Sequence, residues 1–465
     1  MFLLIKSYVL AESPSASDTA NKAAGKHQQP AGRDFDYAEV LQKALFFFDA
    51  QRSGNLPDDF RVPWRGDSAL DDGKDAGVDL TGGYYDAGDH MKFALPLASA
   101  LTLIAWGAIE YRGGYERAAQ WSHLLDVIRW GADWIMKAHA SERVFYAQVG
   151  EPRSDHSFWG PPEAMKMNRP AFKIDAENPG SEIAGEAAAA LAAASILFRG
   201  EDPTYSQNLL GRAQALFDFA DSHRGSYIDV ITSARDYYNS SGYHDELVWS
   251  ALWLYKATGK GDYLQKAESI YRKHFAKASM RWTHSWDDKR YGATIILAQP
   301  TKCEPYRAAV RRWSNYWTIG DQGERIEYTP GGLAWLDSRG SLRYAGTTAF
   351  LAFIYADTVE DVGSRYRDFA RQQVDYILGA NPGGRSYVVG FGNNPPRNPH
   401  HRASHGSPPP QGSRSEKPSS TRRAIPSPAR PAGSQAAEIA AQSSAQVPPA
   451  MSRPTLRETL RYGRC

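Results

Sequence analysis

The chain is poor in cysteine, in long apolar runs and in net charge, and each shortage excludes a class of protein. Only Cys303 and Cys465 occur among its 465 residues, too few for a disulfide framework or a cysteine-rich metal site. No run approaches the roughly 20 apolar residues that cross a bilayer. A formal net charge of +2 leaves no electrostatic footprint for nucleic acid. We therefore expect neither a membrane nor a nucleic acid as a partner.

Aromatic residues are abundant instead. The chain has 13 tryptophans and 25 tyrosines, and all the tryptophans lie between Trp64 and Trp335. Many of these rings must pack in the core. Flat rings with polar edges can also stack on the faces of sugars. The composition is therefore consistent with a large core and with a carbohydrate-binding surface.

Apolar residues recur at helical spacing along most of the chain. Strand signals are few, and the best are at 144–148 and 386–390. Long loops rich in aromatic residues, glycine and proline follow every second helical pattern, which is typical of helical hairpins with a binding face at one end. The pattern predicts eleven helices, near residues 36–51, 91–111, 121–139, 181–198, 205–222, 243–258, 262–275, 290–299, 304–317, 341–357 and 364–379.

Both ends of the chain differ in composition from the middle. Residues 1–34 hold only short, interrupted apolar segments followed by a Ser-, Ala- and Gln-rich stretch, so we predict a disordered leader or linker. Residues 408–465 are rich in Pro, Ser, Ala and Arg without an apolar stripe, which predicts disorder or a stretch translated out of frame. One domain is predicted between them, at 35–407.

The stretch 81–90 combines three glycines and two tyrosines with the carboxylates of Asp86 and Asp89. The glycines favour a tight irregular loop, and the apolar run that begins at Phe93 predicts a helix that anchors it. Two carboxylates on one rigid loop can share a water molecule, since one can orient the water while the other takes its proton. The alternative is that Asp89 merely caps the following helix.

Seven motifs between residues 35 and 407 resemble, in order and spacing, the cellulases of glycoside hydrolase family 9. The resemblance implies an all-α (α/α)6 barrel that hydrolyses internal β-1,4-glucosidic bonds of cellulose or a related β-glucan with inversion. It also implies a secreted enzyme, because the substrate is a polymer, and we expect a monomer. The motifs are GGYYDAGD at 82–89, PGSE at 179–182, YYN at 237–239, WDDK at 286–289, YTPGG at 328–332, SYVVGFG at 386–392 and NPPRNPHHR at 394–402.

The resemblance implies a role for individual residues. Asp89 is similar to the general base that activates water, and Asp86 to the partner that holds this water. His400 is similar to the active-site histidine that hydrogen-bonds the sugar, with a metal pair formed with His401 as the alternative. For any single aromatic ring of the cleft, core packing is the alternative. The residues expected to stack on or hydrogen-bond glucose units are His156, Trp159, Tyr238, Trp282, Arg343, Tyr344 and Arg402.

A structural Ca²⁺ site is also implied by the resemblance. Carboxylates and backbone oxygens are the ligands that a hard cation prefers. The alternative role of the two acidic residues near 245 is to favour the dipole of the helix that begins near 243. The segment 239–242 is one residue shorter than the family pattern and lacks its tryptophan. The implied ligands are Ser241, Gly242, Asp245, Glu246 and Asp287.

The main departure from the family lies at the end of the chain. The family's general acid is a glutamate in an Asn-Glu-(small)-Ala context on the last barrel helix, and no glutamate after Ser407 has that context. An inverting hydrolase needs a second carboxyl group roughly 6.5–9.5 Å from the base. Six hairpins need twelve helices, so eleven predict an incomplete barrel. The alternatives to an active enzyme are a non-catalytic glucan binder and a truncated relative that folds poorly.

Overall fold

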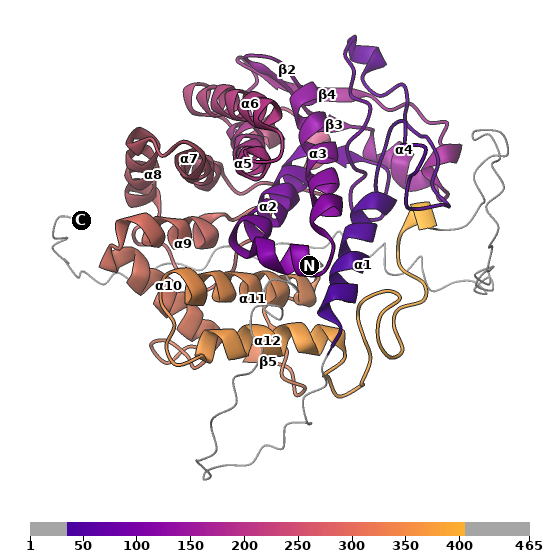
Figure 1. Ribbon diagram of the computed structural model, residues 1–465. Coiled ribbons are helices and arrows are strands. Elements are labelled where there is room, and N and C mark those ends of the chain that lie inside the picture. The colour runs from indigo at the N-terminus through magenta and orange to yellow at the C-terminus, as the bar shows by residue number, and fades with distance from the viewer. Residues whose placement is uncertain (1–34, 405–465) are drawn as a thin grey trace. The chain divides into compact units, whose positions relative to one another are not determined.

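The computed structural model describes residues 35–404, and the predicted leader at 1–34 and tail at 408–465 lie outside this range (Figure 1). The eleven predicted helices are all present, with ends within a few residues of those predicted, except that one helix runs on to Arg117. They are α1 (Tyr37–Ala50), α2 (Ala94–Arg117), α3 (Trp121–Ala138), α5 (Ser181–Phe198), α6 (Pro203–Ser222), α7 (His244–Thr258), α8 (Gly261–His274), α9 (Arg290–Thr301), α10 (Glu304–Trp317), α11 (Ser341–Thr358) and α12 (Arg365–Leu378).

Local sequence signals account for several helix ends. The Asp36 side chain accepts a hydrogen bond from the Glu39 amide at 2.9 Å and so caps α1. Asp202 caps α6 in the same way, with Pro203 at the first helical position. At the other end, α7 stops at Gly259, whose φ of +71° suits glycine.

Neighbouring helices pack as hairpins, namely α2 with α3, α5 with α6, α7 with α8, α9 with α10 and α11 with α12. Helix α5 also packs on α2 and α7, and every residue of α5 except Ile196 is buried. Its alanines let the neighbouring backbones approach closely. Helices α2 and α5 are long and apolar enough to cross a membrane, but 61% and 94% of their most apolar windows are buried within the described structure. Burial in the core accounts for this composition.

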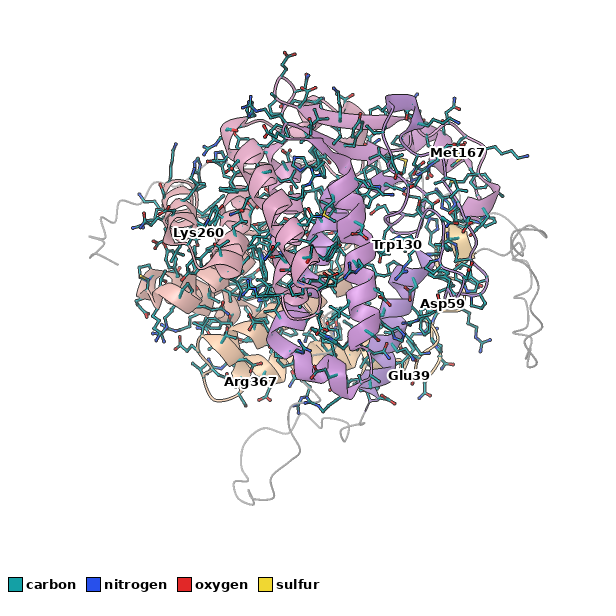
Figure 2. The ribbon with its side chains drawn as sticks, turned by 45° about the horizontal axis from the view of Figure 1, so that its top comes forward. Glu39, Asp59, Trp130, Met167, Lys260 and Arg367 are labelled. Atoms are coloured by element: carbon teal, nitrogen blue, oxygen red, sulfur yellow. The ribbon has the colours of Figure 1, made fainter. Side chains whose placement is uncertain are left out.

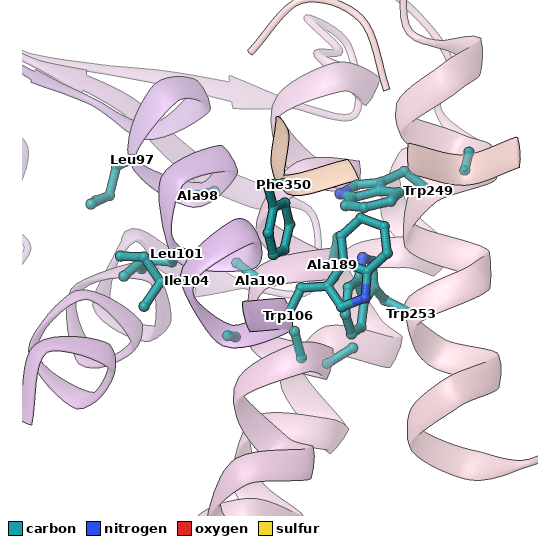
Figure 3. Close-up of a cluster of buried hydrophobic side chains, with 14 of the residues drawn as sticks. Leu97, Ala98, Leu101, Ile104, Trp106, Ala189, Ala190, Trp249, Trp253 and Phe350 are labelled. Carbon is teal, nitrogen blue, oxygen red and sulfur yellow. The ribbon is translucent and has the colours of Figure 1, made fainter. Parts of the chain in front are cut away.

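A cluster of aromatic rings joins three of these helices (Figure 3). The indole of Trp106 on α2 meets Trp249 and Trp253 of α7 edge to face, with ring centroids 5.6 and 5.9 Å apart. Phe350 of α11 packs against the same indole at 5.4 Å. Such contacts add to the burial of large rings, so α2, α7 and α11 share one core.

The strands are short and lie in the loops between helices. Strands β1 (Lys92–Phe93), β2 (His139–Ser141) and β4 (Ala171–Asp175) all pair antiparallel with β3 (Val144–Val149), which confirms the strand predicted at 144–148. Strands β5 (Glu327–Tyr328) and β6 (Ala334–Trp335) form a separate hairpin. The shorter helices are α4 (Pro152–Ser157) and the 3₁₀ turns η1 (Lys74–Ala76), η2 (Pro162–Ala164), η3 (Tyr227–Asp229), η4 (Thr232–Ala234) and η5 (Arg402–Ser404).

The strand predicted at 386–390 is wrong, because this segment forms turns and bends. Ser386 folds back locally, since its hydroxyl accepts a hydrogen bond from the Val388 amide at 3.0 Å. Gly390 and Gly392 follow with φ of +71° and +67°, which extended strands do not contain. The consecutive residues Tyr387, Val388 and Val389 therefore mark a packed loop here, with Val388 buried.

Candidate active site

The loop that carries Asp86 and Asp89 is fastened to α3 and β1 by hydrogen bonds to its backbone carbonyls. Trp130 of α3, labelled in Figure 2, donates its indole N–H to the Gly83 carbonyl at 2.8 Å. Trp134, one turn on, donates to the Leu80 carbonyl at 3.0 Å. The Lys92 ammonium donates to the Leu80 and Gly82 carbonyls at 3.0 and 2.7 Å. Buried donors of this kind hold the loop rigid.

A buried ion network lies behind the loop. Asp72 forms an ion pair with Lys92 at 2.7 Å and a two-pronged pair with the guanidinium of Arg169 at 2.7 and 3.2 Å. Burial would raise the pKa of Asp72, but the attraction of these two cations outweighs burial and lowers it. The same Arg169 donates to the His90 carbonyl at 2.6 Å. The network therefore connects Asp72 to both ends of the acidic loop.

Two glycines of the loop are in positions where a side chain does not fit. A Cβ on Gly83, whose φ is +71°, would lie 2.5 Å from the Trp134 ring. A Cβ on Gly88 would lie 2.2 Å from the backbone oxygen of His400. The close approach at Gly88 brings the 394–402 motif against the acidic loop, and the Arg402 amide donates to the Gly88 carbonyl at 3.0 Å.

The two carboxylates have different partners. The Tyr238 hydroxyl donates to Asp86 Oδ2 at 2.6 Å, which fixes this carboxylate against the 237–239 motif. Asp89 Oδ1 accepts from the Met91 amide at 2.9 Å. Helix α2 begins only at Ala94, after Phe93 as its N-terminal cap, so the interpretation of Asp89 as that helix's cap is wrong. Both side chains thus belong to the loop itself.

Burial and neighbouring negative charges raise the pKa values of this pair. Burial, reinforced by the negative charge of Asp155 and opposed by the Tyr238 hydrogen bond, raises the pKa of Asp86 to about 6. Burial first, and then the charges of Asp86 and Asp155, raise the pKa of Asp89 well above its usual range. A carboxylate with a raised pKa is a stronger base at neutral pH.

These pKa shifts predict the pH dependence of any reaction in which Asp89 acts as a base. The rate should fall as the pH drops through the raised pKa of Asp89, so the acid limb of kcat/KM lies well above pH 4. In Asp86→Asn one of the negative charges that raise this pKa is gone. We expect the acid limb to move to lower pH in that variant, even as the rate falls. A wild-type limb near pH 4, or a limb that moves upward in Asp86→Asn, would contradict the assignment.

Helix α4 brings a third carboxylate to the pair, and sequence reasoning missed it. Asp155 is buried, accepts from the His90 amide at 3.1 Å and forms an ion pair with Arg402 at 2.6 Å. Figure 1 shows α4 beside the turn η5 that carries Arg402. Its neighbour His156 points Nε2 at Asp89 Oδ2, 3.5 Å away. The adjacent pair Asp155–His156 after a proline was the signal available in the sequence.

The two histidines of the 394–402 motif have separate surroundings. The exposed His400 packs its ring against Trp159, with ring centroids 4.9 Å apart. His401 is buried, and its Nε2 lies 2.6 Å from the Gln51 side-chain oxygen. Across residues 35–404, the one group of three or more potential metal-ligating side chains within 4.8 Å of each other contains neither histidine. The geometry therefore does not favour the metal-pair alternative.

The predicted cleft residues fall into two groups. His156, Trp159, Tyr238 and Arg402 surround the acidic loop, and Tyr237, which sequence reasoning missed, stacks on His156 at 5.1 Å. A second group lies on the loop before α9 and at the start of α11. There Trp282 packs on Tyr344 at 5.5 Å, and Arg343 donates to the Tyr344 hydroxyl at 2.6 Å. Trp159, Tyr237 and Trp282 remain 48%, 37% and 36% exposed, respectively, so their rings are available to a ligand.

The predicted calcium residues also come together in part. Asp287 Oδ1 accepts from the Ser241 amide at 2.7 Å, and Asp245 Oδ2 accepts from the Lys289 amide at 2.8 Å. Both oxygens of Glu246 are buried and have no hydrogen-bond partner among residues 35–404. Burial is the main cause that raises the pKa values of Asp245, Glu246 and Asp287. Within residues 35–404 these carboxylates do not form a group whose ligand atoms all lie within 4.8 Å of one another. Buried carboxylates nevertheless suit a cation, and α7 begins at His244, so its dipole also favours Asp245 and Glu246.

A helical barrel that holds paired carboxyl groups beside exposed aromatic rings has the features of a glycoside hydrolase. The family model described as "Glycosyl hydrolase family 9" matches residues 37–434. The chain belongs to this family, and its all-α fold is an (α/α)6 barrel. The predicted incompleteness of the barrel concerns residues beyond 404 and stays a prediction.

Individual relatives and solved structures that resemble this chain are endoglucanases. Endoglucanase B of Cellulomonas fimi is 51% identical over 385 residues, which are 81% of this chain and 37% of that protein. The structure of an endoglucanase from the termite Nasutitermes takasagoensis matches with a TM-score of 0.76 and 47% identity, over 82% of this chain and 86% of that one. Endoglucanase CelQ of Clostridium thermocellum, complexed with cellobiose and cellotriose, matches with a TM-score of 0.73 and 42% identity, over 80% of this chain and 61% of that one.

The chain is shorter than the curated relatives that it matches. It spans 37% of the Cellulomonas fimi protein and 58% and 60% of two Bacillus endoglucanases. The substrate and activity of this chain are therefore inferred below from its own residues together with its family.

Proposed function

We propose that this chain hydrolyses internal β-1,4-glucosidic bonds of cellulose or a related β-glucan, with inversion at the anomeric carbon. The observation that carries the proposal is the convergence of Asp86 and Asp89 on one rigid loop beside exposed aromatic rings, in a member of family 9. Relatives named endoglucanases, one of them complexed with cellobiose and cellotriose, support the substrate class.

In this proposal the two carboxylates have different tasks. Asp86, held by Tyr238 at 2.6 Å, orients a water molecule, and Asp89 takes its proton as the water attacks the anomeric carbon. The raised pKa of Asp89 suits it to accept that proton near neutral pH. His400 and Arg402 bind the sugar at the point of cleavage, while Trp159 supplies a ring on which a glucose unit stacks.

The departing oxygen must also receive a proton. Among the described residues near the loop, Asp155 does not suit this role because Arg402 and the His90 amide occupy its oxygens. The absence of the family's Asn-Glu-(small)-Ala context after Ser407 therefore favours a second candidate function, which is glucan binding without turnover. The aromatic cleft and Arg402 support binding with no acid present.

A paired assay on carboxymethyl cellulose distinguishes the two functions. Reducing sugar release and glucan binding are measured on the same preparation of wild type and Asp89→Asn. Release that Asp89→Asn abolishes supports hydrolysis. Binding without release in the wild type supports the second candidate, and protein that neither binds nor turns over glucan contradicts both.

We also propose that Ca²⁺ stabilises the fold through Ser241, Gly242, Asp245, Glu246 and Asp287. The cation would supply the charge that the buried, unpartnered Glu246 carboxylate lacks. At 100 times its dissociation constant a ligand adds about 2.7 kcal/mol to the free energy of unfolding. We expect EGTA to lower the melting temperature of the wild type and added Ca²⁺ to restore it, with no response in Glu246→Gln. An equal response in both proteins would show that Glu246 is not a ligand.

The location and the oligomeric state of the chain are two further proposals. A glucan polymer does not enter cells, so the enzyme that degrades it is secreted, and we propose an extracellular location. We propose that the chain acts as a monomer, which size-exclusion chromatography with light scattering would check.

A further inference from the structure

The His156 ring is held so that one of its nitrogens faces a carboxylate. Its Nδ1 lies 2.8 Å from the Pro152 carbonyl oxygen, and a carbonyl only accepts hydrogen bonds, so Nδ1 carries a proton and donates it to this oxygen. The other nitrogen, Nε2, faces Asp89 Oδ2 at 3.5 Å. Stacking of Tyr237 on the ring face, at 5.1 Å and 29°, fixes this orientation. A proton or a metal ion between Nε2 and this oxygen would hold the two atoms together.

The geometry of this pair suits a metal ion better than a shared proton. A charge-assisted N–H···O hydrogen bond is about 2.7–2.9 Å long, shorter than the 3.5 Å observed. A metal about 2.1 Å from a nitrogen and from an oxygen in a tetrahedral arrangement separates these two atoms by about 3.4 Å. The hydrogen bond from Nδ1 to a backbone carbonyl is also the usual outer contact of a metal-binding histidine.

A third carboxylate, that of Asp155, lies beside this pair, with its Oδ2 3.8 Å from His156 Nδ1. Within residues 35–404 the single set of three or more His, Cys, Asp or Glu side chains with ligand atoms within 4.8 Å of one another is Asp89, Asp155 and His156. Asp155 also pairs with Arg402 at 2.6 Å, and this cation competes with a metal for the third carboxylate. Two ligands and a partly engaged third favour reversible binding with open positions for water. His156 is 36% exposed, so a hydrated ion can enter from solvent.

We propose that Asp89, His156 and Asp155 form a site for a transition-metal dication such as Zn²⁺ or Co²⁺. Imidazole and carboxylate ligands suit these ions, whereas Ca²⁺ prefers six to eight oxygen ligands, so this site is distinct from the calcium residues. A metal at Asp89 Oδ2 occupies the lone pair that the base needs. Zn²⁺ therefore inhibits the enzyme. This inhibition, unlike the metal binding itself, rests on the proposed function.

The binding test does not depend on activity. Co²⁺ is titrated into the full chain in the presence of excess Ca²⁺, and the visible absorption of the bound Co²⁺ is followed. We expect an intense four- or five-coordinate band that saturates near one equivalent and that Zn²⁺ removes. Loss of a ligand should raise the Co²⁺ dissociation constant of His156→Gln at least about tenfold, since loss of an outer contact alone costs 10–100-fold. His223→Gln, which changes a histidine outside this group, should bind like the wild type.

The outcomes separate the metal site from the catalytic proposal. An absent band, or a band of equal strength in His156→Gln, would overturn the site. A band that depends on His156 supports the site even in a chain that hydrolyses nothing, so failure of the proposed function is recognised separately. In an active chain, Zn²⁺ should lower the rate of the wild type. The Zn²⁺ concentration that halves the rate of His156→Gln, relative to that variant's rate without Zn²⁺, should be at least tenfold higher. Equal sensitivity would show that the metal binds away from the base.

Discussion

Asp89→Asn should lower the turnover of an activated aryl β-cellobioside by about 10²–10⁴-fold, the usual contribution of a general base. An asparagine keeps the shape of the side chain and its contact with the Met91 amide, but it cannot take a proton from water. The dinitrophenyl leaving group departs as a stable phenolate without protonation. Release of this phenolate, followed by absorbance, therefore measures the base even in a chain that lacks the family's general acid.

The affinity for the glycoside should change little, because Asp89 acts on water and the aromatic rings bind sugar. Asp71→Asn is the matched control, since Asp71 lies on the surface of a preceding loop with 83% of its side chain exposed. That variant should hydrolyse the glycoside like the wild type. Turnover of Asp89→Asn within about tenfold of the wild type would show that another group activates the water.

Asp72→Asn should destabilise the domain by about 3–5 kcal/mol, the cost of removing one partner from a buried ion pair. The side chain of Asp72 is 1% exposed and lies between Lys92 and Arg169. An amide would leave two buried cations without compensating charge. The melting temperature and the midpoint of urea unfolding at pH 7 measure the loss. Asp71→Asn, one residue earlier, should have almost no effect, because exposed ion pairs contribute little.

The effect of Asp72→Asn should also depend on pH. The folded-state pKa of Asp72 is lowered, since Lys92 and Arg169 outweigh burial. Its contribution to stability is therefore fully present above the unfolded pKa of about 3.9 and is lost as the pH falls through the lowered folded value. The difference between the variant and the wild type should be constant from pH 5 to pH 7 and shrink below about pH 4. A difference that grows in acid would contradict this account of the network.

The helices could be predicted from the sequence because each carries its own signal. Alanines at 187–194 and the cap at Asp202 act within a few residues of the helices that they specify. The strand at 144–148 was likewise visible as an apolar run. The segment 386–390 was misread because its run of a tyrosine and two valines belongs to a loop with Gly390 and Gly392, whose positive φ values a strand does not contain.

The acidic pair was predicted, but its support was not. Asp86 and Asp89 lie three residues apart in the sequence, so their spacing alone suggested shared chemistry. The contacts that set their properties join distant segments, as in the Tyr238–Asp86 hydrogen bond and the Asp155–Arg402 ion pair. These separations, of 152 and 247 residues, leave no periodicity or local motif. Only a fold that brings α4, the 237–239 motif and η5 together makes them visible.

The most direct test of the central claim, that Asp89 activates a water opposite the leaving group, is azide rescue of Asp89→Ala. The shortened side chain leaves room for an anion where the water would lie, and azide needs no base. With a dinitrophenyl β-cellobioside, azide should accelerate phenolate release and give the α-configured cellobiosyl azide, because attack from the face opposite the leaving group inverts the anomeric carbon. A β-configured azide, or no acceleration by azide, would contradict the account.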